Sequence, residues 1–153
     1  MQKINTSHMP IVVSHHMLKS LVKGVEKMSK SIPDSAIFME DSIKEVERKI
    51  KNAYCPEKEV DDNPLFDYIK YLIFPKFGNF ELKRLDKHGG DKVYNNYEEI
   101  CKDYKDSNLH PKDLKENVAR LINDMIEPVR KHFENDPEAK KILSLVNSFK
   151  VTR

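Results

Sequence analysis

The sequence is poor in several residue types, and each shortage narrows the possible classes of protein. The 153 residues include only two cysteines, Cys55 and Cys101, which are too few and too far apart for a disulfide framework or a zinc cage. No apolar run approaches the roughly 20 residues that a membrane span requires. The N-terminal stretch MQKINTSHMPIVV lacks the basic and long apolar regions of a signal peptide. We therefore expect reduced thiols, no membrane association and a cytoplasmic location.

Charge of one sign is not in excess either. Lysine and arginine number 27 against 25 acidic residues, which leaves a net charge of +2 with both signs interspersed. This balance is too mild to indicate a nucleic-acid-binding protein, so any contact with RNA must come from local placement of residues. The hydrophobic share of 39% indicates a globular chain, long enough for a single core.

Helical signals dominate from about residue 42 onward. Ser42 followed by Glu45 forms a capping box that opens a predicted helix through IKEVERKIKNAY. Asn63 and Pro64 begin a second helix, which we expect to end before Pro75. The segment NNYEEICKDYKDS predicts a third, short helix.

Two further helices are predicted near the C-terminus. HPKDLKENVARLINDMIEPVRKHF carries an apolar stripe at helical spacing, although Pro128 should kink or weaken the helix. The stripe consists of Val118, Leu121, Ile122, Met125, Ile126, Val129 and Phe133. The last helix starts near Asn135, with Pro137 in its first turn, and runs through EAKKILSLVNSF.

β-structure is predicted in two places. FELKR and DKVY, separated by LDKHGG, indicate a small hairpin or loop pair that turns at Gly89-Gly90. PIVVS, residues 10–14, indicates one buried strand without a strand partner nearby in the sequence. The predicted fold class is therefore mainly α, a helical domain with a small β or loop insertion, preceded by a strand and a long loop.

Two groups of residues are expected to have no binding role. His15 and His16 are adjacent on an extended segment and point to opposite faces, so we predict no metal site there. The aromatic and apolar residues of NPLFDYIKYLIF are expected in the core rather than on a base-stacking platform. They are Phe66, Tyr68, Ile69, Leu72, Ile73 and Phe74.

The long connection after residue 15 contains the basic stretch KMSKS, residues 27–31. Its two ammonium groups stand three residues apart beside serines, and lysine is a compact, mobile charge suited to phosphate. A solvated basic loop is the alternative, and it is the commoner case for a generic stretch of this kind.

The stretch KMSKS is the signature loop of class I aminoacyl-tRNA synthetases, and its flanks extend the resemblance. VVSHHMLKSLVKGVEKMSKSIPDSAIFMEDS, KIKNAYCP, NPLFDYIKYLIFP, GGDKVY, LHPKDLKENVA and EPVRKHF together resemble the C-terminal half of tyrosyl-tRNA synthetases of the archaeal or eukaryotic type. The resemblance runs from about Pro10 to Arg153 with the motifs in the same order.

The resemblance implies that the loop binds ATP, with Mg²⁺ expected alongside the nucleotide and no protein-bound metal. Its lysines, Lys27 and Lys30, would be catalytic, because they hold the triphosphate and stabilise charge on the leaving pyrophosphate as tyrosine attacks. The ATP-binding loop comprises Lys27, Met28, Ser29, Lys30 and Ser31. The two serines would shape the loop or bind phosphate. Ile32 departs from the acidic or polar residue frequent in the family, so the resting conformation of the loop is expected to differ.

The resemblance also implies an anticodon site formed by His88, His110 and Asp113. Imidazole rings can sandwich the guanine at the first anticodon position, and a carboxylate can accept from its N–H groups. The residues alone favour a plainer alternative, in which Asp113 stabilises the first turn of a helix. Relatives can carry phenylalanine at the position of His88.

A complete synthetase of this kind needs a nucleotide-binding, Rossmann-like fold with a His-x-Gly-His motif. None of the four glycines here is followed by histidine, so the motif is absent. By the resemblance, residues 1–41 are a C-terminal remnant of the catalytic domain, with its last strand and the signature loop. Residues 42–153 are the helical anticodon-binding domain.

Two functions are compatible with these features. In the first, the chain is the C-terminal portion of a tyrosine–tRNA ligase that acts on tRNA(Tyr). Its catalytic half would lie on the same gene product or another chain, and the family forms homodimers through that missing domain. In the second, the chain is a stand-alone tRNA-binding module with a vestigial loop and no catalysis.

Overall fold

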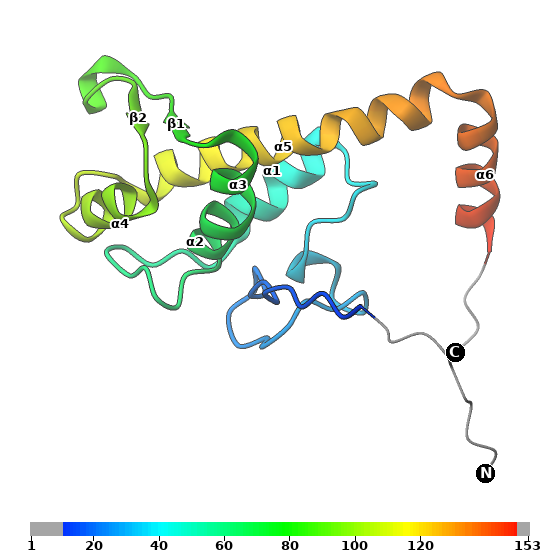
Figure 1. The fold of residues 1–153 in the computed structure, drawn as a ribbon, viewed down its shortest axis with the longest axis horizontal. Helices are drawn as coiled ribbons and strands as arrows, with labels where there is room; N and C mark the ends of the chain where they lie inside the picture. Colours follow the sequence, from blue (N-terminus) through cyan, green and yellow to red (C-terminus); the bar gives the residue numbers. More distant parts are fainter. Residues whose placement is uncertain (1–10, 150–153) are drawn as a thin grey trace, which may run out of the picture.

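The longest helix, α5 (Pro111–Asn135), forms the axis of the computed structural model, which describes residues 11–149 (Figure 1). Helix α1 (Ile43–Asn52) packs along it. The predicted cap of α1 is confirmed, because the Ser42 hydroxyl accepts a hydrogen bond from the Glu45 N–H at 3.2 Å.

Three consecutive pieces form the second helical segment. They are α2 (Pro64–Tyr68), a π-helical turn (Ile69–Ile73) and α3 (Phe74–Phe77). Asn63 caps the segment, because its side-chain oxygen accepts from the Leu65 N–H at 3.1 Å. The predicted start of this helix is therefore confirmed.

The expectation that this helix ends before Pro75 was wrong. The helix continues to Phe77 and ends at Gly78, whose φ of 77° is left-handed. A proline ring normally clashes with the carbonyl four residues earlier. Here the Phe74 N–H bonds to the carbonyl of Ile69, five residues back, and this wider turn accommodates the ring.

The predicted hairpin is confirmed. Strand β1 (Phe80–Leu82) pairs antiparallel with β2 (Lys92–Tyr94). Its connection contains the 3₁₀ turn Asp86–His88, followed by Gly89 and Gly90 with φ of 103° and 67°. Both glycines take a backbone conformation that other residues rarely adopt, so the sharp turn depends on them.

The remaining helices also follow the sequence. Helix α4 (Tyr97–Lys105) succeeds the hairpin, and α6 (Pro137–Ser148) succeeds α5 after Asp136, which caps it. Pro128 lies inside α5, which continues past it to Asn135. In the apolar stripe of α5, Val118, Leu121, Ile122 and Ile126 are buried, whereas Met125, Val129 and Phe133 are only half-buried.

The core lies between α1, α5 and the segment that contains α2. The aromatic and apolar residues predicted for it are confirmed there: Phe66, Tyr68, Ile69 and Ile73 are buried, and Leu72 and Phe74 are partly buried against them. Residues 11–42, which precede α1, are called the arm below. Leu21 of the arm is fully buried in the same cluster. The part of the arm around Leu21 is therefore packed onto the helical domain.

The predicted strand at residues 10–14 was wrong within the described residues. Residues 11–20 have no regular secondary structure, and Ile11, Val12 and Val13 are 93%, 80% and 86% exposed. A strand needs a neighbour for its N–H and C=O groups. The two strands of the described region pair only with each other. Pro10 lies outside the described residues.

Candidate functional site

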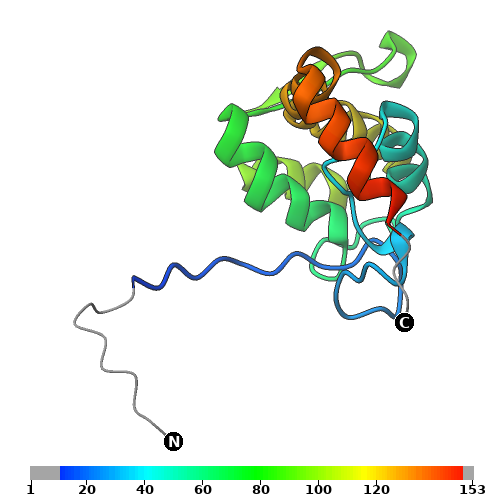
Figure 2. The same ribbon diagram turned by 90° about the vertical axis from the view of Figure 1, so that its right-hand side faces the viewer.

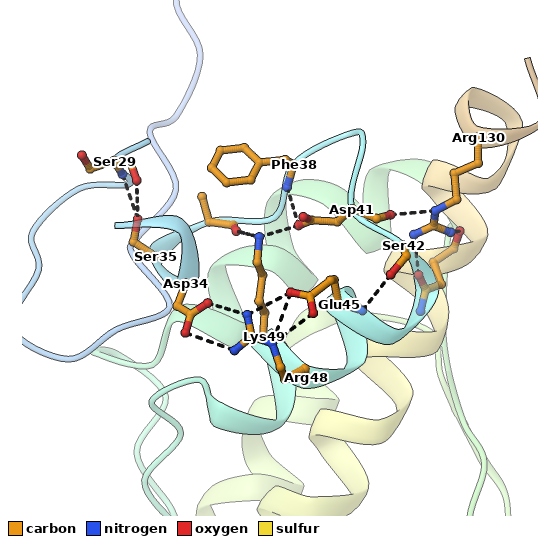
Figure 3. A network of polar contacts seen from close by, with 12 residues as sticks. Ser29, Asp34, Ser35, Phe38, Asp41, Ser42, Glu45, Arg48, Lys49 and Arg130 are labelled. Carbon is orange, nitrogen blue, oxygen red and sulfur yellow. Dashed lines mark hydrogen bonds and ion pairs between the residues drawn. The ribbon is translucent and has the colours of Figure 1, made fainter. Parts of the chain in front are cut away.

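The loop formed by residues 27–31 is built around the main chain of Ser29. Its N–H donates to the Ser35 hydroxyl at 2.8 Å, and its carbonyl accepts from that hydroxyl at 3.1 Å (Figure 3). The same carbonyl accepts from the Ile32 N–H at 3.0 Å. The Ser31 N–H donates to the Ser29 side chain at 3.2 Å. The centre of the loop is therefore closed into a tight turn, and Ser29 shapes it.

Lys27 and Lys30 flank this fixed centre, and both are exposed. Within residues 11–149 neither ammonium group forms an ion pair with a carboxylate. Met28, between them, is partly buried against the core. The loop thus holds its apolar residue inward and presents two cations to solvent, where an anion could approach.

The arm after the loop is held to α1 by Arg48. Its guanidinium donates to both carboxylate oxygens of Asp34, at 2.6 and 3.1 Å, and also to Glu45 at 2.9 Å. The hydrogen bonds from Arg48 lower the pKa of the Asp34 carboxyl below its ordinary value. This contact ties the turn that follows the signature loop to the first helix.

Lys49, next along α1, is buried, with 3% of its side chain exposed. Its ammonium contacts Asp41 Oδ2 at 2.6 Å and the Ala36 carbonyl at 3.0 Å, and it lies 4.5 Å from the centre of the Phe38 ring. The Asp41 carbonyl accepts from Arg130 Nε of α5 at 2.9 Å. Sequence reasoning missed this cluster, since nothing local distinguishes Lys49 from the exposed lysines beside it.

Two of the three candidate anticodon residues, His110 and Asp113, lie at the start of α5. His110 caps this helix, because its Nδ1 accepts from the Lys112 N–H at 3.1 Å, and its side chain is 65% exposed. Asp113 follows in the first turn and is half-buried. No donor within the described residues hydrogen-bonds to the Asp113 carboxylate, so its oxygens are not used to cap the helix.

His88 lies on a separate element, the exposed connection between β1 and β2. Two contacts hold that connection beside the start of α5. Arg84 Nη1 donates to the Asn108 carbonyl at 2.9 Å, and the buried Asn117 side chain bonds to the N–H and carbonyl of Lys83 at 2.8 and 2.9 Å. The fold therefore brings the hairpin connection of His88 toward the helix of His110.

The two candidate sites lie on different sides of the molecule. In both views the signature loop lies at one side of the helices and the hairpin connection at the other (Figures 1 and 2). A single small ligand therefore cannot contact both, whereas a long polymer can.

His16 is engaged within the fold. Its Nε2 lies 3.2 Å from Asp67 Oδ2, and its ring stacks on Tyr71 at 3.8 Å. Among the described residues no group of three histidine, cysteine or acidic side chains is placed to hold a metal ion. Over the same part of the chain, no helix is long and apolar enough to span a bilayer.

The profile of the family described as tRNA synthetases class I (W and Y) matches residues 1–127. The chain therefore belongs to the class I tRNA synthetases. Within this family its relatives are tyrosine–tRNA ligases of the archaeal and eukaryotic type, as the sequence motifs indicated.

Two curated relatives illustrate the similarity. The chain is 49% identical to the cytoplasmic tyrosine–tRNA ligase 1 of Arabidopsis thaliana over 150 residues, which are 98% of this chain and 39% of that protein. It is 38% identical to the tyrosine–tRNA ligase of Saccharolobus solfataricus over 162 residues, covering 99% of this chain and 44% of the relative. The chain thus spans less than half the length of these relatives.

Solved structures agree with this assignment. The Leishmania major tyrosyl-tRNA synthetase in complex with tyrosinol matches with a TM-score of 0.78 and 34% identity, over 92% of this chain and 22% of that one. The Pyrococcus horikoshii enzyme complexed with L-tyrosine matches with a TM-score of 0.75 and 37% identity, over 85% of this chain and 40% of that one.

Proposed function

We propose that this chain is the portion of a tyrosine–tRNA ligase that supplies the ATP-phosphate-binding loop and a tRNA(Tyr) anticodon-binding domain. Residues 1–41 would contribute the loop to the catalytic domain, and residues 42–153 would form the anticodon domain. The observation that carries the proposal is a pair of exposed lysines on either side of a fixed Ser29, neither of them in an ion pair within residues 11–149, in a chain of this family. As in the relatives named cytoplasmic, the expected location is the cytoplasm.

The chemistry expected of the loop is electrostatic. The tyrosine carboxylate attacks the α-phosphate of ATP, and negative charge accumulates on the departing pyrophosphate. Lys27 and Lys30 would hold the β- and γ-phosphates and compensate that charge, while Mg²⁺ accompanies the nucleotide. The hydrogen bonds with Ser35 fix the main chain of Ser29, so the backbone between Lys27 and Lys30 has a defined conformation.

The anticodon end would read a single base. Asp113 offers a carboxylate that accepts no hydrogen bond from the described part of the chain, which suits the N–H groups of guanine. His110 is exposed beside it and His88 is presented by the neighbouring hairpin, so their rings could stack on an unpaired base. The separation of this end from the signature loop fits a substrate as long as tRNA.

The alternative function is a stand-alone tRNA-binding module. A chimeric enzyme distinguishes this module from a portion of a ligase. In the chimera this chain replaces the matching 150-residue segment of the Arabidopsis ligase. We expect the chimera to charge tRNA(Tyr) with tyrosine. A folded chimera that binds tRNA but forms no adenylate would favour the module.

By itself, the 153-residue chain is expected not to form tyrosyl-adenylate, because it contains no His-x-Gly-His motif. The measurement is tyrosine-dependent exchange between ATP and pyrophosphate, with the chimera as the positive control. Exchange above a buffer blank by the purified chain would contradict this prediction.

Replacing Asp113 by alanine should weaken binding of a tRNA with guanine at the first anticodon position by about 1–3 kcal/mol. The effect should be far smaller for tRNAs with another base there, because only guanine offers the matching donors. Filter binding over a series of tRNA variants measures this difference. Glu116→Ala is the matched control, since it removes an exposed carboxylate one turn further along α5.

Other substitutions should leave different signatures in the same assay. His110→Ala and His88→Ala should cost roughly 1–3 kcal/mol with little dependence on the base, because stacking is sequence-tolerant. Lys112→Ala and Lys115→Ala should weaken every tRNA equally and flatten the salt dependence. An equal loss for every first base in Asp113→Ala would leave the aspartate as a helix-end residue only.

A further inference from the structure

Ser35 lies outside residues 27–31, and its side chain is hydrogen-bonded to the centre of the signature loop. It is fully buried, and both hydrogen bonds of its hydroxyl go to the main chain of Ser29, at 2.8 and 3.1 Å. Ser29 is the third residue of the stretch 27–31. The hydroxyl therefore fixes the backbone between the two lysines without touching either of them.

The residues on both sides of Ser35 are anchored to α1. Asp34 receives two hydrogen bonds from Arg48, and the Ala36 carbonyl accepts from the buried Lys49 ammonium at 3.0 Å (Figure 3). The N–H of Leu21 also donates to the Ser35 carbonyl at 3.0 Å. Contacts with α1 thus fix residues 34 and 36, and the hydroxyl of Ser35 between them connects this fixed segment to the signature loop.

We infer that Ser35 is a positioning residue for the ATP-phosphate-binding loop. Its hydroxyl holds Lys27 and Lys30 at a fixed position relative to α1, so that both cations meet the phosphates without a further loss of loop freedom. Electrostatic stabilisation depends on such preorganisation, and a displacement of about 1 Å can cost about 100-fold in rate. This inference rests on the proposed function of the loop.

The chain provides a matched control in Ser20. This residue is also buried, at 5% exposure, and its hydroxyl likewise bonds to the N–H and carbonyl of one residue, Val22, at 3.1 and 3.3 Å. It lies in the same arm but makes no hydrogen bond to residues 27–31. Ser20→Ala therefore removes an equivalent local contact without releasing the signature loop.

The first test uses the full 153-residue chain and does not depend on activity. In Ser35→Ala the Ser29 amide loses its acceptor, so its hydrogen exchange should accelerate at least tenfold, whereas the amides of α1 should be unchanged. Ser20→Ala should leave the Ser29 amide as it is in the unaltered chain. Equal exchange of that amide in Ser35→Ala and the unaltered chain would overturn the inference.

The second test measures single-turnover adenylate formation in the chimera with the Arabidopsis ligase. Ser35→Ala should slow this step by about 10- to 100-fold. The apparent affinity for ATP should fall, and that for tyrosine should be unchanged. A loss of folded enzyme would instead reduce active-site number without altering the rate per site. Ser20→Ala should retain the original rate, and an unslowed Ser35→Ala variant would overturn the inference.

Lys27→Ala in the same chimera separates this inference from the proposed function. If Lys27→Ala is slow and Ser35→Ala is not, only the positioning role fails. If neither is slow, the loop has no catalytic role. If Ser35→Ala melts below the assay temperature, Arg48→Met is used instead. Arg48 is exposed, and its loss removes the contact with Asp34 that holds the same arm to α1. It should slow the reaction while melting normally, and an unchanged rate would count against the inference.

Discussion

In the chimeric ligase, replacing Lys27 or Lys30 by alanine is expected to slow tyrosyl-adenylate formation by about 10²–10³-fold for each lost contact. The binding of tyrosine should change much less. The reason is that charge accumulates on pyrophosphate only as the bond breaks, so the lysine contacts strengthen in the transition state. A lysine that bound tyrosine and the transition state equally would not give this pattern.

The measurement combines single-turnover kinetics with a tyrosine titration. Lys23→Ala serves as the matched control, because Lys23 is an exposed lysine of the same arm whose ammonium lies over the Tyr54 ring at 4.7 Å. Its loss should leave the rate within about threefold, as expected for a contact outside the phosphate site. Unchanged single-turnover rates in the Lys27→Ala/Lys30→Ala double variant would refute the assignment.

Replacing Asp41 by alanine is expected to lower the free energy of unfolding by about 3–5 kcal/mol. Among the described residues, this substitution leaves the buried Lys49 ammonium with the Ala36 carbonyl and the Phe38 ring as its remaining partners. An unpaired charge in the interior is costly because it has lost its hydration. Urea unfolding of the 153-residue chain, followed by circular dichroism, measures the change.

A double variant identifies the origin of that loss. Asp41→Ala combined with Lys49→Met removes both charges and keeps an apolar stem in place, so it should be much more stable than Asp41→Ala alone. Glu116→Ala is the control, since its pair with Lys112 is exposed and should contribute less than about 1 kcal/mol. If the double variant is as unstable as the single one, the loss comes from the other contacts of the Asp41 side chain, among them the hydrogen bond from the Phe38 N–H at 2.9 Å, rather than from the unpaired charge.

The chain positions of the helices were predictable because their signals are local. Ser42 and Asn63 each cap a helix through an N–H two or three residues away, and the stripe of α5 reports its buried face. The exception, Pro75, shows the limit of local rules. The wider π-turn before it changes which carbonyl the ring approaches, and the residue pattern contains no sign of that turn.

The strand predicted at residues 10–14 failed for a different reason. Its β-branched residues favour extended backbone, but strand formation requires a second strand alongside, and propensity cannot provide one. Ile11, Val12 and Val13 therefore remain exposed and without regular secondary structure within the described part of the chain. Local composition indicated a preference for strand without specifying a partner strand.

By itself the sequence determined the helices, the hairpin, the core and the family, through caps, periodicity and an ordered set of motifs. It also identified the lysines of the signature loop. Only the tertiary structure decided how that loop is held. Ser35 bonds to Ser29 six residues away, Lys49 to Asp41 eight away, and Asp41 to Arg130 across 89 positions. The packing of α1 between the arm and α5 determines these partners. A buried polar group needs a hydrogen bond, and it forms one with the group that the fold places beside it.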